Sequence, residues 1–151
     1  MIQRVQSFYL FLTSLFYFLY WFFGKDWYLK GYENFEKNLG EIHSFFLSFT
    51  CVFPLLISII CFSTLLLFKK RLIQIKLSNL VLYMSGFLCL YTVFFFSVTL
   101  NFLSGIMPSQ LMTLLLYAAV LNPFICTYLI FMTIKSIKKD EKLVSGEGLI
   151  R

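Results

Sequence analysis

The chain has 151 residues, of which 60% are hydrophobic, 21% are aromatic and 13% are charged, and its formal net charge is +6. Soluble domains carry roughly one-quarter charged residues, and a soluble fold of this length cannot bury so many large apolar side chains. The apolar residues form long runs without the alternation of barrel strands, so this pattern disfavours an outer-membrane barrel and predicts an all-α integral membrane protein.

An apolar run over residues 5–23 predicts the first membrane span. Bulky Phe and Tyr side chains fill the end of this run, and no small-residue cleavage site precedes Gly24 and Lys25. We therefore expect an uncleaved transmembrane helix rather than a signal peptide. Trp21 and Trp27 bracket the exit of the span, as aromatic residues at a membrane interface commonly do.

Residues 24–43 form the longest polar connection, predicted to lie outside the cytoplasm, with three lysines against four acidic residues. Aromatic and aliphatic side chains recur in it at helical spacing, although Gly31 and Gly40 interrupt the pattern. This spacing predicts an amphipathic helix that lies on the membrane surface or caps the bundle. Candidate contacts of this connection with a partner or with lipid are Trp27, Tyr28, Tyr32 and Phe35.

Three further apolar runs, over residues 44–68, 77–102 and 110–134, predict the remaining spans. Each run is long enough to cross a hydrocarbon core of about 30 Å. Small and hydroxyl residues form a stripe along one face of the second and third spans, and Ser48 and Ser85 belong to these stripes. Such residues let neighbouring helices approach closely and form hydrogen bonds across the interface.

Asn122 and Pro123 stand at the centre of the fourth span, with Ala118 and Cys126 on the same helical face as Asn122. A kink is expected at Pro123 and at Pro54 in the second span. A broken helix at this depth is how many transporters build a binding site. The alternative is an asparagine that bonds a neighbouring helix beside an ordinary proline kink. We favour this packing interpretation, because transport coupling usually requires an intramembrane charge and the four runs contain none.

The basic residues predict the orientation. Ten of the 13 Lys and Arg residues lie before the first run, in the connection of residues 69–76 or in the tail of residues 135–151. The other three lie in residues 24–43. The positive-inside rule then places both termini in the cytoplasm, with residues 1–144 as one domain of two antiparallel hairpins. Candidate contacts with anionic lipid or a partner in this cationic set are Lys69, Lys70, Arg71, Lys138 and Lys139.

No motif in the sequence specifies a reaction, a metal or a cofactor. The four cysteines lie inside apolar runs without a CxxC pair, and His43, the only histidine, stands near Glu36 and Glu41 without the spacing of a ligand set. No catalytic motif places a nucleophile, an acid or a base. Basic residues at the ends of apolar runs orient a membrane protein rather than bind nucleic acid. We therefore expect no enzyme activity, cofactor, metal site or nucleic-acid partner.

Short motifs at both ends of the chain carry a family resemblance. The first is Met1-Ile2-Gln3-Arg4-Val5-Gln6 before the aromatic first span, and the second is Ile137-Lys138-Lys139-Asp140-Glu141-Lys142-Leu143-Val144 after the fourth. Together they resemble a bacterial family of small four-helix inner-membrane proteins that is catalogued only as a domain of unknown function. The tail departs from that pattern at residues 145–148, where further basic residues are expected. The resemblance implies the fold and an inner-membrane location, and it brings no catalytic residues.

Two functions follow from these expectations. The first is a non-enzymatic structural or accessory subunit of a larger membrane assembly, whose partners are the lipid bilayer and other membrane subunits or further copies of the chain. The alternative is a small oligomeric transporter or channel that uses the kink at Asn122 and Pro123. A lipid-handling enzyme would require a polar interfacial pocket that the sequence does not locate. The polar stripes, the bulky aromatic residues and the lack of reactive groups favour the first function.

Overall fold

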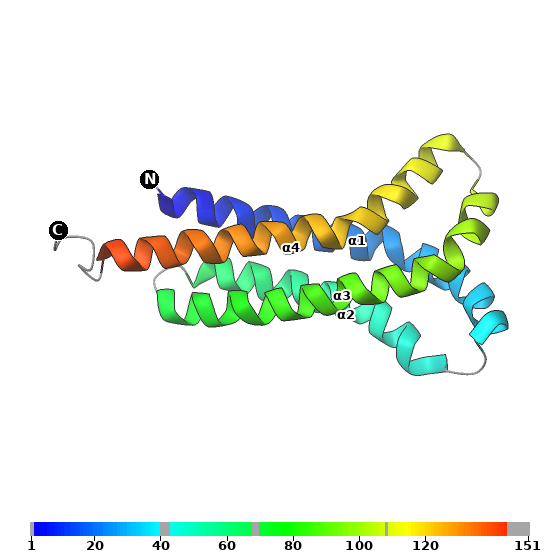
Figure 1. Ribbon diagram of the computed structural model, residues 1–151, viewed down its shortest axis with the longest axis horizontal. Helices are drawn as coiled ribbons and strands as arrows, with labels where there is room; N and C mark the ends of the chain where they lie inside the picture. Colours follow the sequence, from blue (N-terminus) through cyan, green and yellow to red (C-terminus); the bar gives the residue numbers. More distant parts are fainter. Residues whose placement is uncertain (1, 40–42, 68–69, 108, 145–151) are drawn as a thin grey trace.

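The computed structural model describes the backbone of residues 2–39, 43–67, 70–107 and 109–144, and the side chains of residues 5–32, 52–67, 70–107 and 109–141. This part of the chain forms four helices, namely α1 (Ile2–Leu39), α2 (His43–Leu66), α3 (Arg71–Ile106) and α4 (Gln110–Val144). They pack lengthwise into one bundle, in which the first turns of α1 and the last turns of α4 lie at the same end (Figure 1). The predicted all-helical fold is confirmed for the described residues.

Three of the helices are long and apolar enough to cross a membrane, namely Val5–Tyr32 within α1, Arg71–Ile106 and Gln110–Glu141. The part of α2 whose side chains are described, Val52–Leu66, is a shorter apolar helix. Large apolar side chains point outward from all four helices, and Leu90 is 73% exposed. A soluble monomer rarely exposes so much contiguous apolar surface. The bundle is therefore compatible with a multi-pass membrane protein.

The first helix continues without a break beyond residue 23, where the apolar run ends. Gly24 and Gly31 both lie inside α1, which runs to Leu39. The segment expected to be a polar connection with a separate surface helix is therefore, as far as Leu39, the continuation of the first helix. Residues 40–42 lie outside the described part of the chain.

Gly31 permits this continuation because it lies where α1 crosses α3. A Cβ atom at residue 31 would stand 3.1 Å from Phe95 Cζ and 3.2 Å from Leu103 Cδ1. An interior glycine costs a helix about 1 kcal/mol relative to alanine. Here the missing side chain lets the two helices approach closely, so tertiary packing outweighs the local preference to break the helix.

Two more segments that were expected to be connections are largely helical. The helix α3 begins at Arg71, so most of the basic stretch of residues 69–76 forms its first turns. At the other end of the chain, α4 continues through the first part of the expected tail to Val144. Lys and Glu are good helix formers, and residues 135–144 contain neither Gly nor Pro, so nothing ends this helix at the end of the apolar run.

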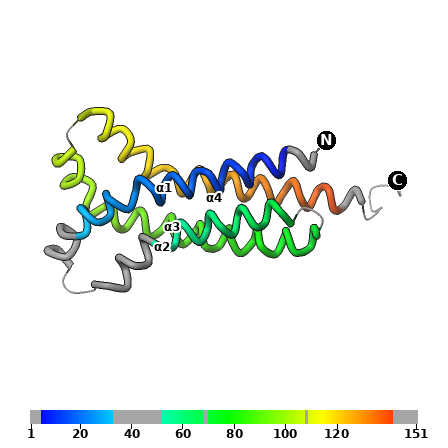
Figure 2. The backbone as a smooth tube through the Cα atoms, turned by 180° about the vertical axis from the view of Figure 1, so that it is seen from behind, coloured from blue at the N-terminus to red at the C-terminus, as the bar shows by residue number. Residues whose placement is uncertain are grey.

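The bundle opens into a fork at the end opposite the chain termini. Figure 1 shows the α1–α2 hairpin and the α3–α4 hairpin pointing away from one another there, and Figures 1 and 2 both show α4 changing direction as it leaves the bundle. Pro54 and Pro123 lie inside α2 and α4, respectively. A proline lacks the amide hydrogen of the helical ladder and bends a helix locally.

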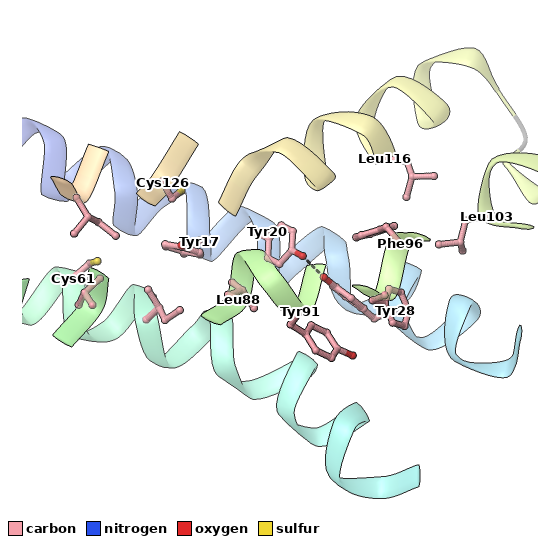
Figure 3. Packing of buried hydrophobic residues seen from close by; sticks show 14 of the residues in the cluster. Tyr17, Tyr20, Tyr28, Cys61, Leu88, Tyr91, Phe96, Leu103, Leu116 and Cys126 are labelled. Carbon is pink, nitrogen blue, oxygen red and sulfur yellow. Dashed lines mark hydrogen bonds between the residues drawn. The ribbon is translucent and has the colours of Figure 1, made fainter. Parts of the chain in front are cut away.

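Aromatic side chains of α1 and α3 fill the core where the fork begins (Figure 3). The ring of Tyr28 packs 4.7 Å from that of Phe95 and 5.7 Å from that of Phe96, measured between ring centroids. Tyr17, one of the largest fully buried side chains, lies nearer the middle of the bundle. These contacts hold the long first helix against α3.

Candidate functional site

Hydroxyl groups from three helices form one chain of hydrogen bonds at the middle of the bundle. Tyr17 Oη on α1 lies 2.6 Å from Ser85 Oγ on α3, and Ser85 is also hydrogen-bonded to Thr127 Oγ1 on α4. Cys89 Sγ, one turn along α3, lies 3.3 Å from the same Thr127 oxygen. We call Tyr17, Ser85, Thr127 and Cys89 the hydroxyl network.

The hydroxyl network connects α1, α3 and α4. Thr127 Oγ1 also donates to the carbonyl oxygen of Pro123, 2.7 Å away, so its hydrogen is used within α4. Hydroxyls without an adjacent base or a bound metal are weak nucleophiles. Among the side chains that the structure describes, no group of three or more His, Cys, Asp and Glu residues could hold a metal ion. The network is therefore suited to holding α1, α3 and α4 together.

Asn122 joins α4 to α1 one turn away from the network. Its Nδ2 donates to the main-chain oxygen of Phe16 at 3.1 Å, and its Oδ1 accepts a hydrogen bond from Cys126 Sγ at 3.5 Å. Pro123 and Cys126 are buried, whereas Ala118 is exposed on the outer side of α4. The shared helical face predicted for these residues thus runs from the core at Cys126 to the surface at Ala118.

A second interhelical contact joins α1 and α2 through a pair of serines. Ser58 Oγ donates to the main-chain oxygen of Ser14 at 2.9 Å, and Ser14 Oγ donates to the main-chain oxygen of Ser58 at 3.1 Å. Both side chains are buried. Ser58 belongs to the stripe of small and hydroxyl residues in the second predicted span. Ser14 was not predicted, because it stands in an apolar run whose length and aromatic content dominate the sequence pattern.

Tyr28 lies in the core, not on the contact surface where the sequence interpretation placed it. Its side chain is 3% exposed, and its hydroxyl is hydrogen-bonded to that of Tyr20, eight residues earlier on α1 (Figure 3). The physical reason is that α1 stays helical across the expected boundary of the span. Because residues eight apart lie near the same helical face, Tyr28 follows Tyr20 into the bundle.

The termini of the described chain meet at one polar junction. Gln6 Nε2 on α1 donates to Asp140 Oδ2 on α4 at 2.5 Å, and Arg71 Nη1 at the start of α3 donates to the main-chain oxygen of Asp140 at 3.3 Å. Gln6 is buried although it is polar. Three helices therefore end in mutual hydrogen bonds. Gln6 and Asp140 each belong to one of the two terminal motifs, but their pairing was not predicted, since it spans 134 positions.

The remaining predicted contact residues are spread over both ends of the bundle. Lys70, Lys138 and Lys139 are exposed, and Arg71 is half-buried at the terminal junction. Trp27 and Tyr32 are half-buried near the fork. These two groups lie at opposite ends of the bundle, so the structure does not bring them together. The side chains that fall outside the described part are those of Phe35, His43, Ser48 and Lys69.

A groove runs along the outside of the bundle between α1 and α4, beginning at the fork. Its volume is ≈ 350 Å³, and it extends along α1 from Phe16 to Trp27 and along α4 from Leu115 to Ile125. Asn122 lies in its wall. A second groove of ≈ 310 Å³ lies between α1 and α2 beside Ser14 and Ser58. Neither groove could be located from the sequence, because each depends on the angle between two helices.

The long apolar helices and the hydroxyl and amide contacts between them define a class of protein, a polytopic helical bundle compatible with a membrane. The chain belongs to the family described as "Domain of unknown function (DUF4293)", whose model matches residues 2–146. This match confirms the expected membership of a family of unknown function, whereas its bacterial origin stays a prediction. No curated protein and no solved structure matches the chain.

Proposed function

We propose that the chain is a protein of the bacterial inner membrane, in which all four helices cross the bilayer and both termini face the cytoplasm. The apolar surface of the helices supports the crossing. The distribution of charge supports the orientation, since basic residues mark the cytoplasmic side. Lys25 and Lys30 are the described cations toward the fork, whereas those toward the terminal junction are Lys70, Arg71, Lys76, Lys135, Lys138 and Lys139.

Within this membrane the chain acts as a non-enzymatic structural or accessory subunit of a larger assembly. One observation carries the proposal: among the fully buried side-chain nitrogen and oxygen atoms of the described residues, Ser78 Oγ alone lacks a hydrogen-bond partner, while large apolar side chains cover the outside. A core of this kind presents no reactive site to a substrate. Its outer helical faces offer packing surfaces to other membrane segments.

The test is chemical crosslinking in native membranes followed by purification in mild detergent. Cysteines are introduced on the outer helical faces, for example at Leu90 or Phe131. If the chain is a subunit, these cysteines should crosslink to the same membrane polypeptide, in a constant ratio of that polypeptide to the chain. Cysteines introduced at buried positions such as Leu88 serve as controls and should yield no crosslink. A chain that remains a lone monomer at its natural abundance would contradict the proposal.

A small oligomeric transporter or channel is the second candidate, and one observation favours it. Asn122, the most polar residue at the middle of α4, lies in the wall of the α1–α4 groove. Against it stands the hydrogen bond of this amide to Phe16 O, which serves helix packing. In a transporter, Asn122→Ala or Pro123→Ala would abolish flux in vesicles while leaving insertion intact. In an accessory subunit, these variants change stability only.

A further inference from the structure

The α1–α4 groove faces the surroundings of the bundle rather than its interior. Of its wall residues, Phe23 and Ile125 are exposed by 55% and 49%, so the groove opens sideways. Figures 1 and 2 both show α4 turning away from α1 along this stretch. For a chain inserted as proposed above, the medium at this opening is the hydrocarbon of one leaflet.

The length of the groove indicates what fills it. Between Phe16 and Trp27 the axis of α1 rises by about 16 Å at 1.5 Å per residue. This is about half of a hydrocarbon core of about 30 Å. Phe16 lies near the middle of the apolar segment Val5–Tyr32, and Trp27 lies near its end, where tryptophan commonly marks the interface. The groove therefore spans one leaflet, from its interface to the midplane, whereas a partner helix would need a groove across both.

The chemistry of the walls selects an apolar occupant. Of the polar wall side chains, the Asn122 amide bonds Phe16 O and the Tyr20 hydroxyl bonds Tyr28, which leaves the single indole N–H of Trp27. An ordered water requires two to four free polar partners, so water does not fill this space. Its volume of ≈ 350 Å³ lies within the usual range of ligand pockets.

Two charges of α1 stand at the outer end of the groove, with Asp26 beside the wall residue Trp27 and Lys30 just beyond it. Asp26 and Lys30 follow the wall residues Leu19 and Phe23 by seven positions each, which is about two helical turns, and both are exposed. One cation and one anion match the phosphate and the ammonium of a zwitterionic headgroup. We propose that the α1–α4 groove binds one acyl chain of a zwitterionic phospholipid, a site that rests on the membrane insertion proposed above.

Lipid retention measured by native mass spectrometry tests the site. The chain, reconstituted in phosphatidylethanolamine bilayers and released in mild detergent, should retain one phospholipid. Ala118→Phe fills the groove from α4, and Gly24→Leu fills it from α1, where a Cβ meets no atom closer than 3.8 Å. Each variant should lower retention about tenfold. Gly105→Phe is the matched control, because a Cβ there meets nothing within 4 Å, and it should retain the lipid.

Tryptophan fluorescence gives a second measurement within the bilayer. The chain has two tryptophans, and Trp21→Phe leaves Trp27, in the groove wall, as the only tryptophan. Phosphatidylethanolamine with brominated acyl chains should quench Trp27 strongly, and adding Ala118→Phe should reduce this quenching at least twofold, whereas Gly105→Phe should not.

The outcomes separate this site from the proposed function. Three results for an inserted chain would overturn the lipid site alone. The chain could retain no phospholipid, the groove-filling variants could retain as much phospholipid as the unmodified chain, or a polypeptide could occupy the groove in place of the lipid. A chain that carbonate extracts from the membrane overturns the insertion and the site together.

Discussion

The amide of Asn122 on α4 donates a hydrogen bond to the carbonyl oxygen of Phe16 on α1, 3.1 Å away, at the inner end of the groove between these helices. Beyond this bond the two helices diverge toward the fork (Figure 1). The contact thus marks the boundary between the closed part of the bundle and its open end.

Asn122→Ala removes this bond and is expected to destabilise the bundle modestly. Interhelical hydrogen bonds in membranes contribute about 0.6 kcal/mol on average and at most about 1.7 kcal/mol. The free energy of unfolding in lipid bicelles, measured by a steric-trapping method, should fall within this range. Ser97→Ala, which removes an exposed hydroxyl bonded only within α3, is the control and should have a smaller effect. An unchanged stability for Asn122→Ala would show that the bond is not made.

Tyr17 and Ser85 are expected to be energetically coupled. Tyr17→Phe removes the hydroxyl that lies 2.6 Å from Ser85 Oγ, and Ser85→Ala removes its partner. A double-mutant cycle in the same unfolding measurement should give a coupling of about 0.6 kcal/mol or more, since Ser85→Ala leaves the buried Tyr17 hydroxyl without this partner, and Tyr17→Phe leaves Ser85 with Thr127 alone. Strictly additive single effects would contradict the hydroxyl network.

Gly31→Leu is expected to disrupt the crossing of α1 and α3. The new side chain would meet Phe95 and Leu103, whose nearest atoms already lie 3.1 and 3.2 Å from the position of a Cβ. Overpacking of this kind costs about 1–3 kcal/mol. Thermal unfolding followed by circular dichroism should show a lowered midpoint. Gly105→Leu, which has open space around it, should leave the midpoint unchanged or raise it, and equal losses in both variants would exclude a close crossing at Gly31.

Asp140→Ala is expected to loosen the terminal junction without unfolding the bundle. Gln6 loses its acceptor, while Arg71 still reaches the main-chain oxygen of residue 140. Hydrogen exchange of the first turns of α1 should therefore accelerate several-fold, because a hydrogen bond contributes about 0.5–1.5 kcal/mol. Glu141→Ala is the neighbouring control. Equal acceleration in both variants would indicate a general charge effect.

The helix content and the family could be predicted from the sequence because long apolar runs and terminal motifs are local signals. The continuation of α1 could not be predicted, since Gly24 and Gly31 ordinarily interrupt a helix and only the close packing of Gly31 on α3 explains why it persists. The burial of Tyr28 follows from that continuation. Asn122 and Ser85 stood out as polar residues within apolar runs.

The partners of these residues, in contrast, could not be predicted. The bond between Asn122 and Phe16 joins residues 106 positions apart, and the junction of Gln6 with Asp140 spans nearly the whole chain. Each groove depends on the angle between the two helices that line it, α1 and α4 or α1 and α2, and no local pattern encodes these angles.

The most direct test of the proposed membrane arrangement is the accessibility of single introduced cysteines to an impermeant maleimide. Lys30→Cys lies toward the fork and Lys139→Cys toward the terminal junction, and both positions are exposed. The unmodified chain is the control, because its described cysteines are buried. The account predicts that intact cells label Lys30→Cys, whereas Lys139→Cys is labelled only after the membrane is permeabilised. Labelling of both positions in intact cells, or of Lys139→Cys alone, would contradict it.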